Sequence, residues 1–223
     1  MKRNIPVLLF LIMPLLTFSQ EPPVEYFEGQ IFYDVEYSEV EEGYSANWLE
    51  LNLGSRMVLT FKNGNTKKEY FSRDGILLST RYLNLKELRS YAVYAYDDTV
   101  LWFDITENDT KLDFQVIKDT LIGDYSCRRV DTKSETISNG DTSKYFARWY
   151  FADSLKLNAD WYDNYNEGSY NEIMDSIPQI PVEYFVSGYP WVQRYKFYKI
   201  EQRKVKRKEV LYTPRRKTPK KEL

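Results

Sequence analysis

The acidic side chains of this sequence are the first candidates for chemistry, because two carboxylates that flank a sugar bond can hydrolyse it without histidine. One acidic group comprises Asp97, Asp98, Asp104, Asp109 and Asp113, and another comprises Glu39, Glu41 and Glu42. Most of these residues lie at predicted turns, where an Asp side chain bonds to nearby backbone. The turn interpretation is therefore favoured over a carboxylate-based hydrolase, and we predict that the protein is not an enzyme.

Histidine is absent from the 223 residues, which removes the commonest general base and the leading nitrogen ligand for metal ions. Cys127 is the single cysteine, so it cannot form a disulfide within the chain. As a nucleophile it would need a lowered pKa, which the neighbouring Arg128 and Arg129 could supply. A buried, small apolar residue is the favoured interpretation. We expect no catalytic residue, no metal site and no cofactor.

Large aromatic side chains occupy both faces of several predicted strands, as where Trp102 stands between Leu101 and Phe103. A sheet with one face in water alternates apolar and polar residues instead. Either a second layer covers the outer face, or a concave face is left apolar to receive a ligand. Ordinary core packing is the simpler alternative. The residues that would line such a ligand site are Trp102, Phe103, Phe114, Phe146, Trp149 and Tyr150.

Strands are the elements that must position these side chains. Alternation begins with Ile31, Tyr33, Val35 and Tyr37, and it predicts further strands over residues 57–61, 67–71, 76–82, 99–105, 112–116, 128–136, 144–151 and 191–205. Asn63-Gly64, Asp74-Gly75 and Asn139-Gly140 have the chemistry of tight turns between strands. Residues 153–187 are irregular and predict a long connection with one helical turn. Residues 20–202 therefore read as one all-β domain.

The N-terminus predicts export from the cytoplasm. Lys2 and Arg3 precede an apolar run over residues 5–16, and Thr17-Phe18-Ser19 offers the small residues of a cleavage site. The run is shorter than the roughly 20 residues that span a bilayer, so we predict a cleaved signal peptide over residues 1–19 and no transmembrane span afterwards. The expected location is the periplasm or the outer membrane, with secretion as an alternative.

The C-terminus is strongly basic. Residues 203–223 contain ten basic and two acidic residues, and Pro214 and Pro219 interrupt them. A solvated, flexible tail is the favoured interpretation. The alternative is a binding element for an anionic surface or an acidic envelope protein. Nucleic acid is a poor partner for an exported protein.

Three short motifs occur in order along the chain. They are Gly29-x-Ile31-x-Tyr33, Ile122-Gly123-Asp124-Tyr125-Ser126-Cys127-Arg128-Arg129, and Ala147-Arg148-Trp149-Tyr150. Together they resemble the GLPGLI family of exported envelope proteins and a related family whose fold is similar to the periplasmic lipoprotein carrier. At the position of the family's name motif, residues 177–182 keep the apolar-Pro-x-apolar pattern without the two glycines.

The resemblance implies an all-β fold built on a single curved antiparallel sheet. That sheet would form a half-barrel, with short helices or loops over its concave face. It names no catalytic residue. Two hypotheses follow. The first is an exported, non-enzymatic envelope protein whose half-barrel binds an apolar or amphipathic, lipid-like ligand. The second is a structural or adaptor protein of the envelope that acts by protein–protein contacts.

Overall fold

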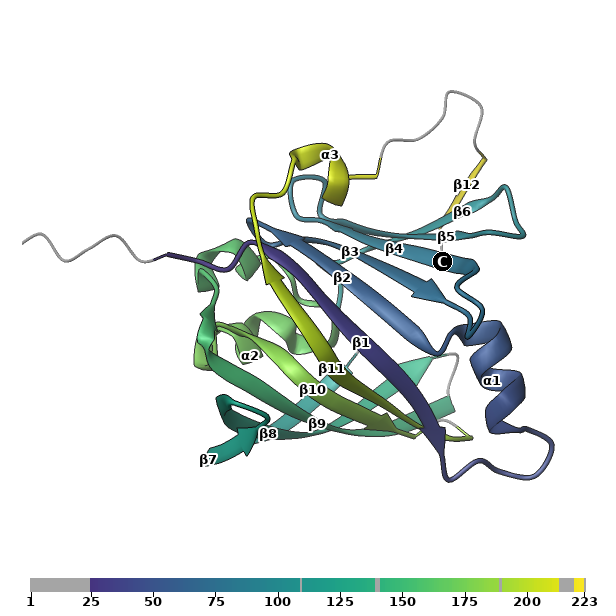
Figure 1. Ribbon diagram of the computed structural model, residues 1–223, viewed down its shortest axis with the longest axis horizontal. Helices are drawn as coiled ribbons and strands as arrows, with labels where there is room; N and C mark the ends of the chain where they lie inside the picture. Colours follow the sequence, from purple (N-terminus) through teal and green to yellow (C-terminus); the bar gives the residue numbers. More distant parts are fainter. Residues whose placement is uncertain (1–24, 109, 139–140, 189, 213–218, 223) are drawn as a thin grey trace, which may run out of the picture.

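The computed structural model describes residues 25–108, 110–138, 141–188, 190–212 and 219–222 (Figure 1). The predicted signal peptide lies outside these residues. The strands of the first half of the chain are β1 (Gly29–Ser38), β2 (Arg56–Lys62), β3 (Asn65–Phe71), β4 (Leu77–Asn84), β5 (Arg89–Tyr94) and β6 (Val100–Asp104). Those of the second half are β7 (Thr110–Ile122), β8 (Tyr125–Ser138), β9 (Asp141–Lys156), β10 (Gln179–Ser187), β11 (Val192–Gln202) and β12 (Lys220–Glu222).

Short helices account for the remaining regular structure. They are α1 (Ala46–Leu53), the 3₁₀ turns η1 (Ala159–Tyr162) and η2 (Glu167–Ser169), α2 (Tyr170–Ser176) and α3 (Arg207–Val210). We call residues 159–176, which contain η1, η2 and α2, the helical segment. Of the described helices, none has the length and apolar character needed to cross a bilayer.

All described strands belong to one open sheet. Its strand order is β12-β6-β5-β4-β3-β2-β1-β11-β10-β9-β8-β7, and the pairs are antiparallel except for β12 beside β6. Figure 1 shows β2–β6 in one wing, β7–β10 in the other, and the helical segment between them. The predicted fold class, an all-β half-barrel made from a single curved sheet, is confirmed.

The chain itself draws the two wings together. In the sheet, β6 and β7 lie near opposite ends, yet in the chain β6 ends at Asp104 and β7 begins at Thr110. The connection between them is short, and each of its residues spans at most about 3.3–3.6 Å. The sheet must therefore curve until its two ends are within reach of this connection. The curvature creates the concave side on which a site can form.

Two of the predicted tight turns are confirmed. Asn63 and Gly64 join β2 to β3 with φ angles of 47° and 77°, the left-handed backbone that a two-residue hairpin requires. Gly75, with φ of 80°, lies in the turn between β3 and β4. The third pair, residues 139–140, lies outside the described residues.

Residues 153–187 are more regular than the sequence predicts, and the prediction of a connection throughout was wrong. Their last part forms β10, in which Ile180, Val182 and Tyr184 alternate as buried residues. Pro181 argued against a strand, but it lies where the pairing with β9 shifts register, so its missing N–H costs little there. Neither β5 nor α1 was predicted from the sequence.

An aromatic ladder crosses the concave face in the middle of the sheet. The rings of Trp149 on β9 and Tyr184 on β10 stack with centroids 4.6 Å apart, and Tyr184 stacks on Tyr195 of β11 at 4.3 Å. Tyr33 of β1 meets Tyr184 edge-on at 6.0 Å. Stacked rings add to the stability that their burial provides, so the ladder makes this part of the sheet a rigid wall.

Part of the basic tail packs on the sheet. Val205 and Val210 are buried, and the Tyr212 ring lies 5.5 Å from that of Tyr82 and 5.1 Å from that of Tyr91. After residues 213–218, which lie outside the described residues, β12 pairs with β6. Residues 203–212, which we call the C-terminal layer, thus pack on the sheet, whereas the sequence favoured a flexible tail.

Candidate functional site

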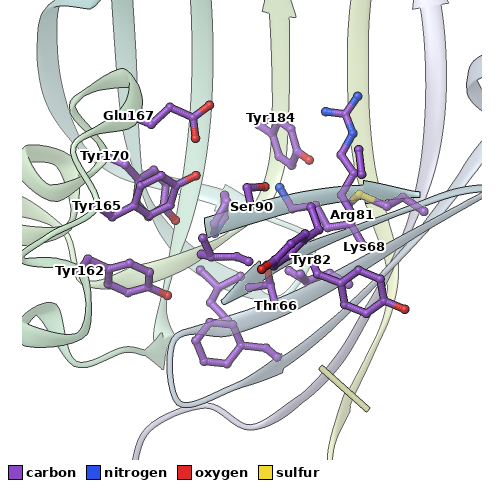
Figure 2. A pocket seen from close by; sticks show the side chains of 18 of the residues that line it. Thr66, Lys68, Arg81, Tyr82, Ser90, Tyr162, Tyr165, Glu167, Tyr170 and Tyr184 are labelled. Atoms are coloured by element: carbon purple, nitrogen blue, oxygen red, sulfur yellow. The ribbon is translucent and has the colours of Figure 1, made fainter. Parts of the chain in front are cut away.

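A cavity of about 380 Å³ lies between the helical segment and the concave face of the sheet (Figure 2). Its volume falls within the range of about 300–1,000 Å³ that is usual for small-molecule sites. Its apolar lining comes from Met57, Leu59, Phe61, Leu83, Ala92, Phe103, Trp149, Ile180 and Pro181. Tyrosines contribute much of the rest of the wall.

The strand wall of the cavity carries two cations side by side. Strand register places Lys68 of β3 directly opposite Arg81 of β4, and Arg81 opposite Ala92 of β5. The next inward-facing positions on these strands are Thr66, Leu83 and Ser90. Polar and apolar groups therefore share this wall, with the cations grouped together.

The helical wall is built mainly of tyrosine. The Tyr165 ring lies 4.8 Å from that of Tyr170, and Tyr162 meets Tyr170 edge-on at 5.4 Å. The backbone amides of Asn166 and Glu167 donate to the carbonyl of the buried Ile105, at 2.8 and 3.1 Å. The helical segment is therefore hydrogen-bonded to the connection between β6 and β7.

Charge is distributed unevenly across the cavity. Of the described residues that line it, Lys68, Arg81 and Glu167 are charged. Figure 2 shows Glu167 on the helical side and both cations on the strand side. Burial raises the pKa of the Glu167 carboxyl above its usual value, although the Tyr165 hydroxyl and the two cations oppose this shift. The cavity therefore has an excess of positive charge.

Several cavity residues present polar groups on an aromatic body. Burial raises the pKa of the Tyr33, Tyr162 and Tyr170 hydroxyls, which therefore stay neutral. Tyr33 donates to the Pro181 carbonyl at 2.6 Å, while the buried Nε1 of Trp149 has no hydrogen-bond acceptor among the described residues. The cavity can therefore hydrogen-bond a ligand that it also surrounds with apolar surface.

Of the six residues that the sequence suggested as the lining of a ligand site, the structure places two in the wall of the cavity and four elsewhere. Phe103 and Trp149 line the cavity. Trp102 instead lies under the Arg89 guanidinium at 4.0 Å, and Phe146 packs on Phe185 at 5.8 Å. Phe114 and Tyr150 pack against the core and are not part of the lining.

Strand alternation explains this division, because adjacent residues such as Trp102 and Phe103 point to opposite faces of the sheet. Sequence reasoning missed Lys68, Arg81, Tyr184 and the tyrosines of the helical segment. The signal for the tyrosines of the helical segment was the density of tyrosine around residues 162–170, in a stretch that looked like a connection.

Two of the acidic residues first considered for hydrolysis form local turn contacts. Asp97 accepts a hydrogen bond from the Thr99 amide at 2.7 Å, and Asp104 accepts one from the Thr106 amide at 2.8 Å. Asp109 lies outside the described residues. Across the described residues, no group of three or more acidic or cysteine side chains is placed to bind a metal ion.

Cys127 is fully buried, and burial, together with the charge of Asp153, raises the pKa of its thiol to about 11. A thiol with so high a pKa is a weak nucleophile at neutral pH. The environment is that of a packed core residue.

Comparison with protein-family models gives no match to this chain, and comparison with curated proteins gives none. The resemblance to the GLPGLI family therefore stays a prediction that rests on the three motifs.

Proposed function

We propose that this protein is an exported, non-enzymatic envelope protein whose half-barrel binds an apolar or amphipathic, lipid-like ligand. The observation that carries the proposal is the cavity of about 380 Å³ on the concave side of the sheet, with apolar side chains over much of its wall. Each apolar square ångström that a ligand removes from water contributes roughly 25 cal/mol. A small molecule can therefore gain affinity here without a catalytic group.

The arrangement of buried apolar residues and more exposed charged residues in the cavity favours an amphipathic ligand. Phe61 and Tyr162 are almost completely buried, whereas Arg81 is exposed. Lys68 and Glu167 have intermediate exposure. An apolar interior with charged groups nearer the solvent matches a molecule that has one apolar end and one polar end.

Filling the cavity tests this function directly. Ala92 lines the cavity on β5, so Ala92→Trp places an indole in the ligand's volume. Ala95→Trp is the matched control, because Ala95 is exposed and does not line the cavity. Binding is measured by the fluorescence of N-phenyl-1-naphthylamine, an uncharged apolar probe, and by mass spectrometry of organic extracts of the gently purified protein.

We expect the unaltered protein and Ala95→Trp to bind the probe and to carry extractable lipid-like material. Ala92→Trp should lose at least about tenfold in probe affinity, the equivalent of 1.4 kcal/mol. Equal probe binding by the two tryptophan variants, or no binding by the unaltered protein, would refute the cavity as a ligand site.

A second candidate function is that of an adaptor, and one surface feature favours it. Trp48 and Leu51 on α1 are 51% and 47% exposed, and the Tyr44 ring lies 6.3 Å from that of Trp48. Exposed apolar clusters often mark protein contacts. Trp48→Ser with Leu51→Ser should reduce capture of an envelope protein in a cross-linked pull-down and leave probe binding unchanged. Unchanged capture would exclude this surface.

A further inference from the structure

Two cations facing each other across neighbouring strands are costly, and the cavity contains such a pair. Lys68 and Arg81 are direct partners in the register of β3 and β4. Like charges at directly opposite positions of a sheet destabilise it. Both side chains also line the cavity, where the surrounding aromatic residues reduce the hydration of the half-buried Lys68. A bound anion would offset this repulsion.

Glu167 supplies the one carboxylate among the described residues that line the cavity. No described carboxylate forms a salt bridge with Lys68. Glu167 attracts both cations from the helical side, but a single carboxylate cannot balance two positive charges. The Arg81 guanidinium also lies 5.7 Å from the Tyr70 ring. Among the described residues that line the cavity, two cations therefore share one carboxylate.

Hydrogen-bond donors surround the same space. Thr66 on β3 and Ser90 on β5 line the cavity, and Trp149 contributes an indole N–H without an acceptor among the described residues. Neutral donors of this kind stabilise an anionic group beside the cations. An apolar molecule alone would cover the Lys68 ammonium and the Trp149 indole N–H without offering either an acceptor, at a cost in binding free energy.

From this arrangement we propose that the ligand is an anionic amphiphile, with its compact anionic group held by Lys68 and Arg81 and its apolar part among Phe61, Leu83 and Tyr162. The inference rests on the proposed ligand-binding function and narrows it to one chemical class. A carboxylate and a phosphate monoester share the required chemistry.

The test compares three ligands that have the same apolar chain. Hexadecanoate, hexadecyl phosphate and hexadecan-1-ol each compete with N-phenyl-1-naphthylamine for the protein. The variants are Lys68→Met and Arg81→Met, which keep an apolar side chain and remove the charge. Lys67→Met is the matched control, because Lys67 is the preceding residue, points to the opposite face and pairs with Glu69 at 2.9 Å.

We expect an anion to bind roughly tenfold more tightly than the alcohol, because charge-assisted hydrogen bonds are stronger than those between neutral groups. Lys68→Met and Arg81→Met should each abolish most of this preference while leaving the affinity for hexadecan-1-ol unchanged. Lys67→Met should behave as the unaltered protein does. The tighter of the two anions identifies whether the natural group is a carboxylate or a phosphate.

The outcomes separate this inference from the proposed function. Equal affinity for the alcohol and both anions, with no effect of either cation variant, would overturn the anionic class and leave ligand binding in place. Failure of all three ligands to displace the probe, or to bind in native mass spectrometry, would overturn both. Far-UV circular dichroism establishes that each variant is folded, and the two cation variants test the inference independently.

Discussion

Glu167 links the cavity to pH, because it is an acidic side chain on a wall that faces two cations. Burial raises its pKa, so the folded state binds this proton more tightly than the unfolded state does. The cost of keeping the carboxylate ionised is fully present at a pH above the folded pKa. That cost disappears as the pH falls from the pKa of Glu167 in the folded state to the ordinary pKa of a glutamate side chain.

Replacing Glu167 by Gln should therefore increase the free energy of unfolding at neutral pH, and the gain should fade as the pH falls through this window. The same substitution should tighten hexadecanoate binding at neutral pH, because the competing carboxylate is gone. Urea denaturation at a series of pH values measures the first effect and probe displacement the second. Glu172→Gln is the control, since Glu172 is exposed on α2. A pH-independent effect of Glu167→Gln would contradict the assignment.

The burial of Cys127 makes a prediction about reactivity. Because the thiol is inaccessible and its pKa is raised to about 11, a thiol reagent such as 5,5′-dithiobis(2-nitrobenzoate) should label the folded protein very slowly at pH 8. In denaturant the same cysteine should react at the rate of an ordinary thiol. The absorbance of the released thiolate follows both reactions. Rapid labelling of the folded protein would show that Cys127 is accessible and reopen a chemical role.

At the scale of elements, the hairpin between β2 and β3 holds the helical segment in place. A Cβ atom on Gly64 would lie 2.4 Å from Cδ1 of Leu85 and 3.0 Å from Cβ of Trp161 in η1. The turn thus packs directly on the first turn of the helical segment. Its close approach depends on a residue with no side chain and with positive φ.

Gly64→Ala should lower the free energy of unfolding by about 2–4 kcal/mol, combining the left-handed backbone penalty with overpacking. Gly75→Ala is a matched control, because Gly75 has a similar φ of 80° but a Cβ added to it would meet no other atom within 4 Å. It should cost only about 1–2 kcal/mol. Denaturant unfolding measures both values. Equal losses would mean that the contact with Trp161 contributes nothing.

The elements also show what the sequence could and could not predict. The Asn63-Gly64 hairpin followed from local turn chemistry, because both residues adopt positive φ at low cost. The strand β10 could not be predicted in this way, because a proline such as Pro181 normally opposes a strand. The sheet accepts Pro181 because the pairing with β9 shifts register there. The cavity lining was predictable for Phe103 and Trp149 only as aromatic residues in strands. Which face becomes concave depends on long-range pairing, such as that of β1 with β11, that a single sequence does not display.

At the scale of the molecule, the half-barrel stays open, and short segments hold its parts together. The connection between β6 and β7 joins the two wings, and its Ile105 carbonyl accepts two amides from the helical segment. The C-terminal layer lies on the β2–β6 wing, with β12 pairing along β6. One side of this layer is apolar, through Val205 and Val210, although the segment is highly charged. Arg203 also forms a salt bridge with Glu209 at 2.8 Å, so part of its charge is used within the fold.

Two truncations should therefore behave differently. Ending the chain after Tyr212 removes residues 213–223, including β12 and five of the ten basic residues of the tail, and we expect a small loss of stability. Ending it after Gln202 removes Val205 and Val210 as well. Burying a valine contributes about 1.5–3 kcal/mol, so this second truncation should cost roughly 3–6 kcal/mol more.

Comparing the stabilities of the two truncated proteins shows whether the C-terminal layer is an integral part of the fold, because they differ by the ten residues 203–212 alone. Guanidinium denaturation gives the midpoints, and Val210→Asp in the full chain reproduces the larger loss if burial of this layer is the cause. Equal midpoints for the two truncations would show that residues 203–212 add nothing to the fold and act only as a charged extension. The expected difference would instead show that residues 203–212 are held on the sheet by the burial of Val205 and Val210.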